Sequence, residues 1–431
     1  MHRSWGRPLR ELRRLRGREV VSSSSGGPPI QSPTTTNARL GDRSLFPDLQ
    51  AVVYANHAAI SPPSLPVRAA VVDALDGYAR HGLAAYFHEL ERRERVRGLL
   101  ARLVGAEPTD VALVANTSTG IVDIALCLPW RTGDRVVLFS GEFPTNVTPW
   151  QQAARRHALE IVWEDGDALR TDRGRALERL EAQLRRGVRL VAISAVQFQT
   201  GQRVPLAEIG ALCARHKAEL FVDAIQALGV IPLDVRALGI HYLVAGSHKW
   251  LMAPEGVGAL YVAPESAAAL KPEVAAWMSH QDAFGFLMRG GGHLTYDRPI
   301  LQTAQMVEGG APNALGIAGL EASTRLLTEL GALAIFDHVQ AWHDAVEPGL
   351  LARGFESART PDTAGRSGIL SVRPRQGESA PAWAKALGER GVSCSSPDGW
   401  LRLSPHWPNA LGEAALVLAA VDEVRAASSP V

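Results

Sequence analysis

The chain has 431 residues, of which 46% are hydrophobic, and its formal net charge at pH 7 is +1. No basic stripe argues for a nucleic-acid partner, and no run of about 18 apolar residues predicts a membrane span. Three cysteines are too few for a disulfide framework. We therefore expect a cytoplasmic protein with no nucleic-acid partner, no membrane partner and no metal site.

The first 44 residues differ in composition from the rest of the chain. An arginine-rich start, MHRSWGRPLRELRRLRGREV, is followed by the Ser/Pro/Thr stretch SSSSGGPPIQSPTTTN. Such a stretch is typical of a flexible segment, so residues 1–44 are predicted to be a disordered extension. An organelle-targeting peptide is the alternative, but Glu11, Glu19 and the lack of a long apolar region favour a plain extension.

The remainder of the chain predicts two domains. Alternating strand and helix signals over residues 45–305 predict a large α/β domain with a mostly parallel sheet. From about Met306 the pattern predicts a long helix, then short strands, and a final helix in EAALVLAAVDEV. Residues 306–431 are therefore expected to form a smaller C-terminal α+β domain. No internal repeat is evident.

The segment VALVANTSTGIVDIAL predicts a phosphate site. Its apolar strand runs into a hydroxyl-rich turn that opens a helix, and free backbone amides at a helix N-terminus bind phosphate. The hydroxyls of Thr117, Ser118 and Thr119 would add hydrogen bonds. Taken alone, the segment favours a plain N-cap that binds no ligand, and only its combination with Lys249 favours the phosphate site.

Asp223 is predicted at the end of a buried strand. The apolar run from Leu220 to Val222 indicates a parallel strand, and open α/β sheets bind ligands at the C-terminal ends of such strands. The carboxylate could keep a pyridine nitrogen protonated, or it could merely cap a helix starting at Ala224. Gln226 would lie on the first turn of that helix and contact the phenolate oxygen of the same ring; a surface glutamine is the alternative.

Lys249 follows a second apolar strand, predicted from Tyr242 to Ala245, and is flanked by His248 and Trp250. An ionised lysine is costly to bury, and a Schiff base removes that cost by neutralising the amine. A lysine amine for covalent attachment and the Asp223 carboxylate for the ring nitrogen are what pyridoxal phosphate chemistry requires. The sequence therefore predicts pyridoxal 5'-phosphate as the cofactor.

These residues resemble the fold-type I pyridoxal phosphate enzymes of aminotransferase class V, a family that includes cysteine desulfurases and isopenicillin N epimerase-like proteins. The resemblance covers about residues 54–424, and seven blocks occur in the family's order: NHAAISP, NTSTG, GEFPTNVTPW, VDAIQALG, GSHKWLMAPEGVG, EGGAPN and LRLSPHW. It implies a large domain with a mostly parallel seven-stranded sheet. It also implies a homodimer, with RGGGHLTYDRP crossing the interface; a mobile surface loop is the alternative for that segment.

The resemblance assigns roles to further residues. Phe143 would stack on the cofactor face, although it cannot exchange protons as the histidine of many relatives can; core packing is the alternative. Ser247 and His248 would add phosphate contacts. Arg402 would bind the substrate carboxylate through parallel hydrogen bonds, which makes a small-molecule α-amino acid the expected substrate; a solvated surface arginine is the alternative. Ala58 would line the substrate side and leave room there; packing beneath a loop is the equal alternative.

Three departures from the family pattern bear on the reaction. Residues 391–402 leave no room for the mobile loop that carries the nucleophilic cysteine of desulfurases, and Cys394 lies in a probable strand. Ala311 replaces a threonine that in relatives reaches the partner's phosphate. Ala195 replaces an asparagine that some relatives aim at the cofactor oxygen, so Gln226 would make that contact alone. Desulfuration through a persulfide is therefore disfavoured.

The expected function is a transformation of an α-amino acid through Lys249, with transamination ranked first. A C–S or other β-lyase and an epimerase stay open, because they use the same attachment and differ in which bond breaks and where the proton returns. A catalytically inactive scaffold is the alternative of another class. The joint presence of Lys249, Asp223, Gln226 and Arg402 argues against a scaffold.

Overall fold

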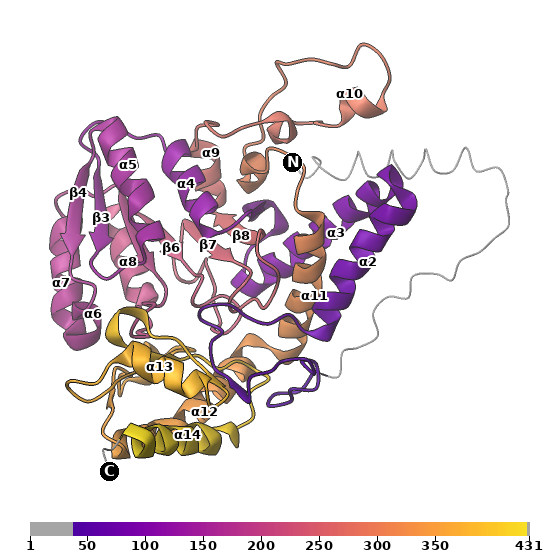
Figure 1. Cartoon of the computed structure of the whole chain (residues 1–431). Helices are drawn as coiled ribbons and strands as arrows, with labels where there is room; N and C mark the ends of the chain where they lie inside the picture. The colour runs from indigo at the N-terminus through magenta and orange to yellow at the C-terminus, as the bar shows by residue number, and fades with distance from the viewer. Residues whose placement is uncertain (1–37, 429–431) are drawn as a thin grey trace.

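Seven strands form the central sheet of the protein, and helices cover both of its faces (Figure 1). The structure is a computed structural model that describes residues 38–428. The strand order is β2-β8-β7-β6-β5-β3-β4, with β8 antiparallel to both neighbours and the other pairs parallel. The strands are β2 (Val111–Val114), β3 (Arg135–Phe139), β4 (Glu160–Glu164), β5 (Leu190–Ser194), β6 (Glu219–Asp223), β7 (Tyr242–Gly246) and β8 (Gly258–Val262). The predicted mostly parallel, seven-stranded sheet is confirmed.

Side chains that alternate along each strand explain the two helical layers. In β6, Leu220 and Val222 belong to one apolar cluster and Phe221 belongs to the other. The Phe221 side packs against α4 (Thr117–Cys127) and α5 (Thr148–His157), and the opposite side packs against α7 (Arg173–Leu184) and α8 (Leu206–His216). The other helices of this part are α2 (Leu65–His81), α3 (Leu83–Val104), α6 (Ala168–Thr171), α9 (Pro264–Ala269), α10 (Gly285–Met288) and α11 (Ala314–Leu330).

The C-terminal part forms a separate layer below the central sheet in Figure 1. Its antiparallel sheet has the order β12-β10-β9, and a parallel pair, β1 with β11, joins it to the N-terminal segment. Its elements are α12 (Ala332–Ala352), β9 (Glu356–Ser357), β10 (Leu370–Arg373), α13 (Ala380–Gly388), β11 (Val392–Ser393), β12 (Leu401–Leu403) and α14 (Glu413–Ser428), with β1 at Val53–Tyr54. This arrangement matches the short strands and the final helix predicted for the C-terminus.

The structure differs from two details of the prediction. The long helix expected after Met306 is two helices, because Gly331 has φ +81° and ends α11 before α12 begins. Residues 225–230 form turns, and no helix follows Asp223, so Asp223 does not cap one. Gly229 lies there with φ +111°, and a Cβ atom on it would meet the carbonyl oxygen of Trp250, which keeps this turn tight.

The proposed boundaries of the extension and of the domains are only partly described. Residues 1–37 of the predicted disordered extension lie outside the described residues. Residues 38–44 pack on the body of the protein: the Gly41 amide donates to the Trp407 carbonyl at 2.7 Å. The division at residue 306 stays a prediction, and α11 packs against α2 and α3. Within residues 38–428 no helix is long and apolar enough to cross a membrane.

Candidate active site

The predicted site residues gather at the C-terminal ends of the central strands. Asp223 ends β6, and Lys249 follows the end of the adjacent strand β7. Ser194, the last residue of β5, is the register partner of Asp223. The turn after β3 carries Phe143. Since parallel strands end at one edge of a sheet, these residues face a common space, as the sequence predicts.

The Asp223 carboxylate is buried, and its Oδ1 atom accepts a hydrogen bond from the Ile225 amide at 2.9 Å. Burial raises the pKa of Asp223 to about 6, while the Ile225 amide and the charge of Lys249 lower it. The positive charge of Lys249 is thus one of the factors that favour the ionised form of Asp223. This arrangement suits a group that has to hold a proton on a neighbouring cationic nitrogen.

The Lys249 amine is held in an environment that favours its neutral form. Burial lowers its pKa to about 8; the negative charge of Asp223 raises the pKa and the positive charge of Arg402 lowers it. The Nζ atom lies 5.8 Å from the centroid of the Phe143 ring. A free lysine amine near neutral pH is a nucleophile and a base.

Hydrogen bonds from distant segments fix the backbone around Lys249. The Ser61 amide donates to the His248 carbonyl at 2.7 Å, and its hydroxyl donates to the Lys249 carbonyl at 2.5 Å. His406 accepts from the Trp407 amide at Nδ1, so Nε2 carries the proton and donates to the Trp250 carbonyl at 3.0 Å. Sequence reasoning gave no role to Ser61 and His406, although they lie in the matched blocks NHAAISP and LRLSPHW.

The start of α4 has free donors where the sequence predicts the phosphate end of the site. Asn116 is the N-cap, and its Oδ1 atom accepts from the Thr119 amide at 2.8 Å. Helix geometry leaves the Thr117 and Ser118 amides without an intrahelical acceptor. The Thr117 hydroxyl accepts from the Gly246 amide at 2.8 Å and keeps its own proton to donate. Ser118 shares a hydroxyl hydrogen bond with Thr145, a residue that sequence reasoning missed.

The second predicted set of phosphate contacts is only partly supported. Both Ser247 donors are already used: its hydroxyl donates to the Pro254 carbonyl and its amide to the Val257 carbonyl. The His248 ring lies beside the end of β7, where a Cβ atom on Gly246 would meet both this ring and the Thr117 hydroxyl at 3.3 Å. His248 is therefore well placed near the phosphate end, and the role of Ser247 stays a prediction.

The Gln226 side chain is buried and has a defined orientation, although it lies in a turn and not on the predicted helix. Its Oε1 atom accepts from the Trp250 indole at 2.8 Å, and its Nε2 atom donates to the Ala58 carbonyl at 3.0 Å. The indole can only donate, so the assignment of oxygen and nitrogen is fixed. One N–H of Gln226 remains for a further acceptor, as the predicted phenolate contact requires.

Phe143 is 48% exposed, which contradicts the alternative that it packs in the core. Its ring makes an edge contact with Phe198, at 5.3 Å between centroids, and borders the Lys249 amine. An aromatic face thus covers one side of the space above Lys249.

Arg402 lies on β12, as predicted, and is 5% exposed. Its Nε atom donates to the Ser395 hydroxyl at 3.1 Å, and its Nη1 atom donates to the Phe198 carbonyl at 2.7 Å. Burial lowers its pKa to about 10, and its charge acts on Lys249. Ala58 is buried in the main apolar cluster, and its amide donates to the Ser404 hydroxyl at 3.0 Å, so its role on the substrate side stays a prediction.

The three cysteines are free, and none is a good nucleophile. Burial raises the pKa of Cys394 to about 12 and that of Cys213 to about 12, and it also raises the pKa of Cys127. A thiol, not a thiolate, is therefore present at neutral pH. This supports the prediction that Cys394 does not act as a desulfurase nucleophile.

An open α/β sheet with a lysine, a carboxylate and a helix N-terminus at one edge defines an enzyme site of the pyridoxal phosphate type. The sequence model of the family described as Aminotransferase class-V matches residues 66–400. The chain therefore belongs to the class V aminotransferase family, whose cofactor is pyridoxal phosphate. The predicted family and enzyme class are confirmed.

Individual relatives carry different names. The chain is 29% identical to an uncharacterized aminotransferase, YcbU, of Bacillus subtilis, over 89% of this chain and 96% of that protein. It is 32% identical to a cysteine desulfurase of Salmonella newport, over 63% of this chain and 66% of that protein. These names differ in reaction, so they leave the reaction of this chain open.

Solved structures confirm the fold. A cysteine desulfurase from Thermococcus onnurineus has a TM-score of 0.76 and 23% identity, covering 86% of this chain and 94% of that one. A variant of C-DES with glycine covalently linked to its PLP cofactor has a TM-score of 0.78 and 24% identity, covering 88% and 98%. At these identities the likeness establishes the fold-type I architecture alone.

Proposed function

We propose that the protein converts an α-amino acid in a pyridoxal phosphate-dependent reaction of the aminotransferase type. One observation carries this proposal: Lys249, Asp223 and Arg402 share one buried site in which the charges of Asp223 and Arg402 both act on the lysine amine. These are the groups that the reaction needs for attachment, for the ring nitrogen and for the substrate carboxylate.

The residues present fit the cofactor. The amides of Thr117 and Ser118, with the hydroxyls around them, would hold the phosphate. Asp223 would hold the ring nitrogen, and the remaining N–H of Gln226 would donate to the phenolate oxygen. Phe143 would cover one face of the ring. When bound, pyridoxal phosphate supplies an electrophilic carbon and a conjugated ring that accepts electrons.

Lys249 would act as the base of the reaction. Its pKa of about 8 leaves a useful fraction of the amine unprotonated near neutral pH, so Nζ can accept a proton and return it. Phe143 cannot take part in proton transfer, and transamination needs one base that can serve two carbon atoms on the same face, one in the substrate and one in the cofactor. A single lysine in this place supports transamination ahead of reactions that need bases on both faces.

Arg402 would select a substrate with a carboxylate. The contacts to Ser395 and Phe198 fix the plane of its guanidinium group, and no acceptor within residues 38–428 binds Nη2. That nitrogen is left for a charge-assisted hydrogen bond to the substrate.

A product assay tests the reaction. The purified enzyme, loaded with cofactor, is given a panel of L- and D-amino acids with and without an α-keto acid acceptor. Transamination predicts a new keto acid that forms only when the acceptor is present, without ammonia or sulfide. Release of ammonia or sulfide without an acceptor would replace this proposal by the C–S or β-lyase, and inversion of the substrate alone would replace it by the epimerase.

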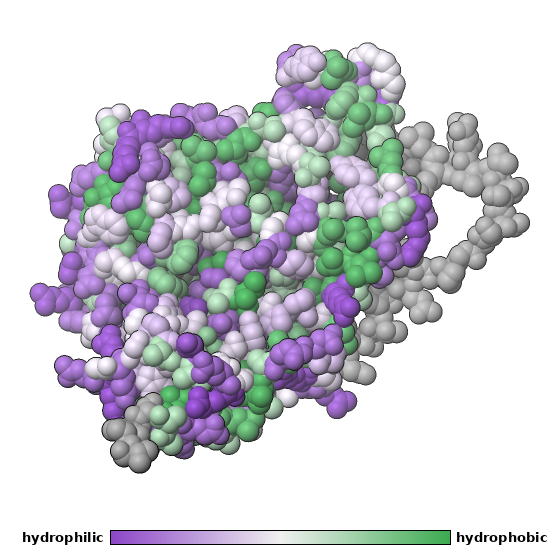
Figure 2. All heavy atoms as spheres, in the orientation of Figure 1, coloured by the Kyte–Doolittle hydropathy of each residue, from purple (hydrophilic) through white to green (hydrophobic). Residues whose placement is uncertain are grey.

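We further infer that the working form is a homodimer. Residues 281–299, with α10, project from the body of the single chain (Figure 1), and this projection exposes apolar side chains (Figure 2). Leu287 and Leu294 are each 58% exposed and Tyr296 is 85% exposed. Large apolar side chains that a single chain leaves exposed are typical of an interface, and we infer that a second copy of the chain covers them.

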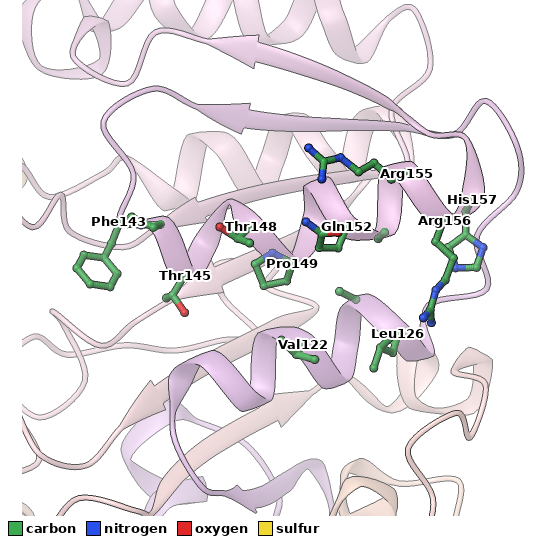
Figure 3. Close-up of a pocket in the computed structure, with 13 residues that line it drawn as sticks. Val122, Leu126, Phe143, Thr145, Thr148, Pro149, Gln152, Arg155, Arg156 and His157 are labelled. Atoms are coloured by element: carbon green, nitrogen blue, oxygen red, sulfur yellow. The ribbon is translucent and has the colours of Figure 1, made fainter.

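An open groove offers a second apolar surface for such a partner. It has a volume of about 820 Å³ and lies between α4 and α5, where Val122 and Leu126 face Pro149 and Gln152 (Figure 3). Phe143 lies at one end of this row. Light scattering at micromolar concentration tests the dimer, with a mass near twice 46.2 kDa expected; a monomer over the working range of concentration would contradict it.

The cytoplasm is the proposed location. All three cysteines are free in the structure, which suits a reducing compartment. Fractionation of cells that express the full chain tests this proposal, and recovery in a membrane or secreted fraction would contradict it.

A further inference from the structure

Glu142 is a carboxylate at the edge of the site. It lies in the block GEFPTNVTPW, but neither the sequence analysis nor the proposed reaction gives it a role. It precedes Phe143 on the turn after β3 and is half-buried. Its Oε1 atom accepts from the Ser194 amide at 2.7 Å, and its Oε2 atom accepts from the Ser194 hydroxyl and from Asn146 Nδ2, the latter at 3.2 Å. Carboxylates with several donors of this kind are strongly oriented.

These contacts connect Phe143 to the strand beside Asp223. Ser194 is the register partner of Asp223, and the Asp223 carbonyl accepts from the Ala195 amide at 2.8 Å. Asn146 is itself fixed, because its Oδ1 atom accepts from the Trp150 indole at 3.2 Å. Glu142 therefore bridges the turn that presents the Phe143 ring and the end of β5.

Glu142 also interacts electrostatically with Asp223. Burial raises the pKa of Glu142 to about 7, the hydrogen bonds from Ser194 and Asn146 lower it, and the negative charge of Asp223 raises it. Its direct partners are neutral, and Lys249 is the cation that faces Asp223. When it is ionised, Glu142 adds negative charge beside the group that would hold the ring nitrogen.

We propose that Glu142 is a positioning residue: through Ser194 it keeps the Phe143 ring in place over Lys249, and its charge supports Asp223 in retaining a proton on the cofactor ring. This inference rests on the proposed function. It assigns to Glu142 no contact with substrate and no proton transfer. It predicts effects on the binding and on the spectrum of the cofactor, which do not depend on turnover.

Two substitutions test the hydrogen bonds of Glu142 and its charge. Glu142→Ala removes all three hydrogen bonds. Glu142→Gln removes the charge and keeps an oxygen that can accept from the Ser194 amide. Its NH₂ group then faces Asn146 Nδ2, which is also a donor. The Asn146 amide cannot flip to offer its oxygen, because that oxygen accepts from the Trp150 indole. Glu164→Gln is the matched control, since Glu164 is a buried carboxylate at the end of β4 that contacts Arg179 and Gln183.

The measurements are the dissociation constant of pyridoxal phosphate and the pH midpoint of the visible spectrum of the bound cofactor. Glu142→Ala should weaken binding about tenfold, the effect of losing about one net charge-assisted hydrogen bond. Glu142→Gln should move the spectral midpoint to lower pH, because removal of a negative charge disfavours the protonated form. Glu164→Gln should change neither quantity.

If the wild-type protein binds the cofactor and both Glu142 variants match it in affinity and midpoint, the inference is overturned and the proposed function stands. Equal shifts in Glu164→Gln would also overturn it, since the effect would then belong to any buried carboxylate of this sheet edge. A wild-type protein that binds no pyridoxal phosphate would overturn the inference and the proposed function together.

Discussion

The Nζ atom of Lys249 lies 5.8 Å from the centroid of the Phe143 ring, so a reactive amine and an aromatic face border the same space. The charges of Asp223 and Arg402, which are opposite in sign, both act on this amine. The site thus combines groups from the turn after β3, the ends of β6 and β7, and β12 of the C-terminal part.

Replacing Arg402 with lysine should weaken substrate binding. The ammonium group cannot reproduce the contacts to Ser395 and Phe198 that orient the guanidinium group. We expect KM for the amino acid to rise about 10- to 100-fold with a smaller change in kcat, since a hydrogen bond to a charged group contributes about 1.5–3 kcal/mol. Steady-state kinetics measures this. Arg373→Lys, an exposed arginine that stacks on Trp400, is the control, and an equal effect there would refute the role of Arg402.

Asp223→Asn should leave the fold intact and reduce the rate. The amide has nearly the shape of the carboxylate but carries no charge to hold a proton on the ring nitrogen. We expect kcat to fall by about 100-fold or more, the scale of losing a positioned proton-holding group. The measurement is kcat under saturating cofactor and substrate. Wild-type kcat in this variant would show that Asp223 serves only the turn with Ile225.

His406 should make the protein sensitive to acid. Burial lowers its pKa to about 4, whereas an unfolded histidine has a pKa of about 6.5. Between these values the unfolded chain binds more protons, so the free energy of unfolding falls as pH decreases through this window, by about 3 kcal/mol in total for this group. Above pH 6.5 both states are neutral and the effect disappears.

The variant His406→Gln tests whether His406 causes the loss of stability in acid. Glutamine can still donate to the Trp250 carbonyl, so the variant should lose less stability than the wild type between pH 7 and pH 5. Urea unfolding at both pH values measures the difference, with exposed His81→Gln as the control. An unchanged difference in His406→Gln would assign the acid sensitivity to other groups.

Cys394→Ala should retain full activity. Burial raises the pKa of this thiol to about 12, so it is not a nucleophile at neutral pH. Product formation and trapping of persulfide are the measurements. Loss of sulfide release together with loss of a trapped persulfide in the variant would establish a desulfurase that uses Cys394.

The residues that end strands were predictable from the sequence. Continuous apolar runs identify β6 and β7, and position along a parallel strand then places Asp223 and Lys249 at one edge of the sheet. The hydroxyl-rich start of α4 is also a local signal, because helix N-termini have a recognisable composition.

Contacts between distant segments could not be predicted in this way. Ser61 and His406 reach the carbonyls around Lys249 only after the N-terminal and C-terminal segments pack together. Glu142 is one acidic residue among many until the fold brings it to Ser194. The helix expected after Asp223 fails for a tertiary reason, since Gly229 has to approach the Trp250 carbonyl closely.

The central claim is that Lys249 holds pyridoxal phosphate covalently for amino-acid chemistry. The most direct measurement is the visible spectrum of the purified protein after incubation with the cofactor, compared with Lys249→Ala and with exposed Lys385→Ala. The account predicts an absorbance band that resists dialysis in the wild type and in Lys385→Ala, is absent in Lys249→Ala, and shifts when the right amino acid is added. A wild-type protein that stays colourless after reconstitution would contradict the enzyme and favour an inactive scaffold.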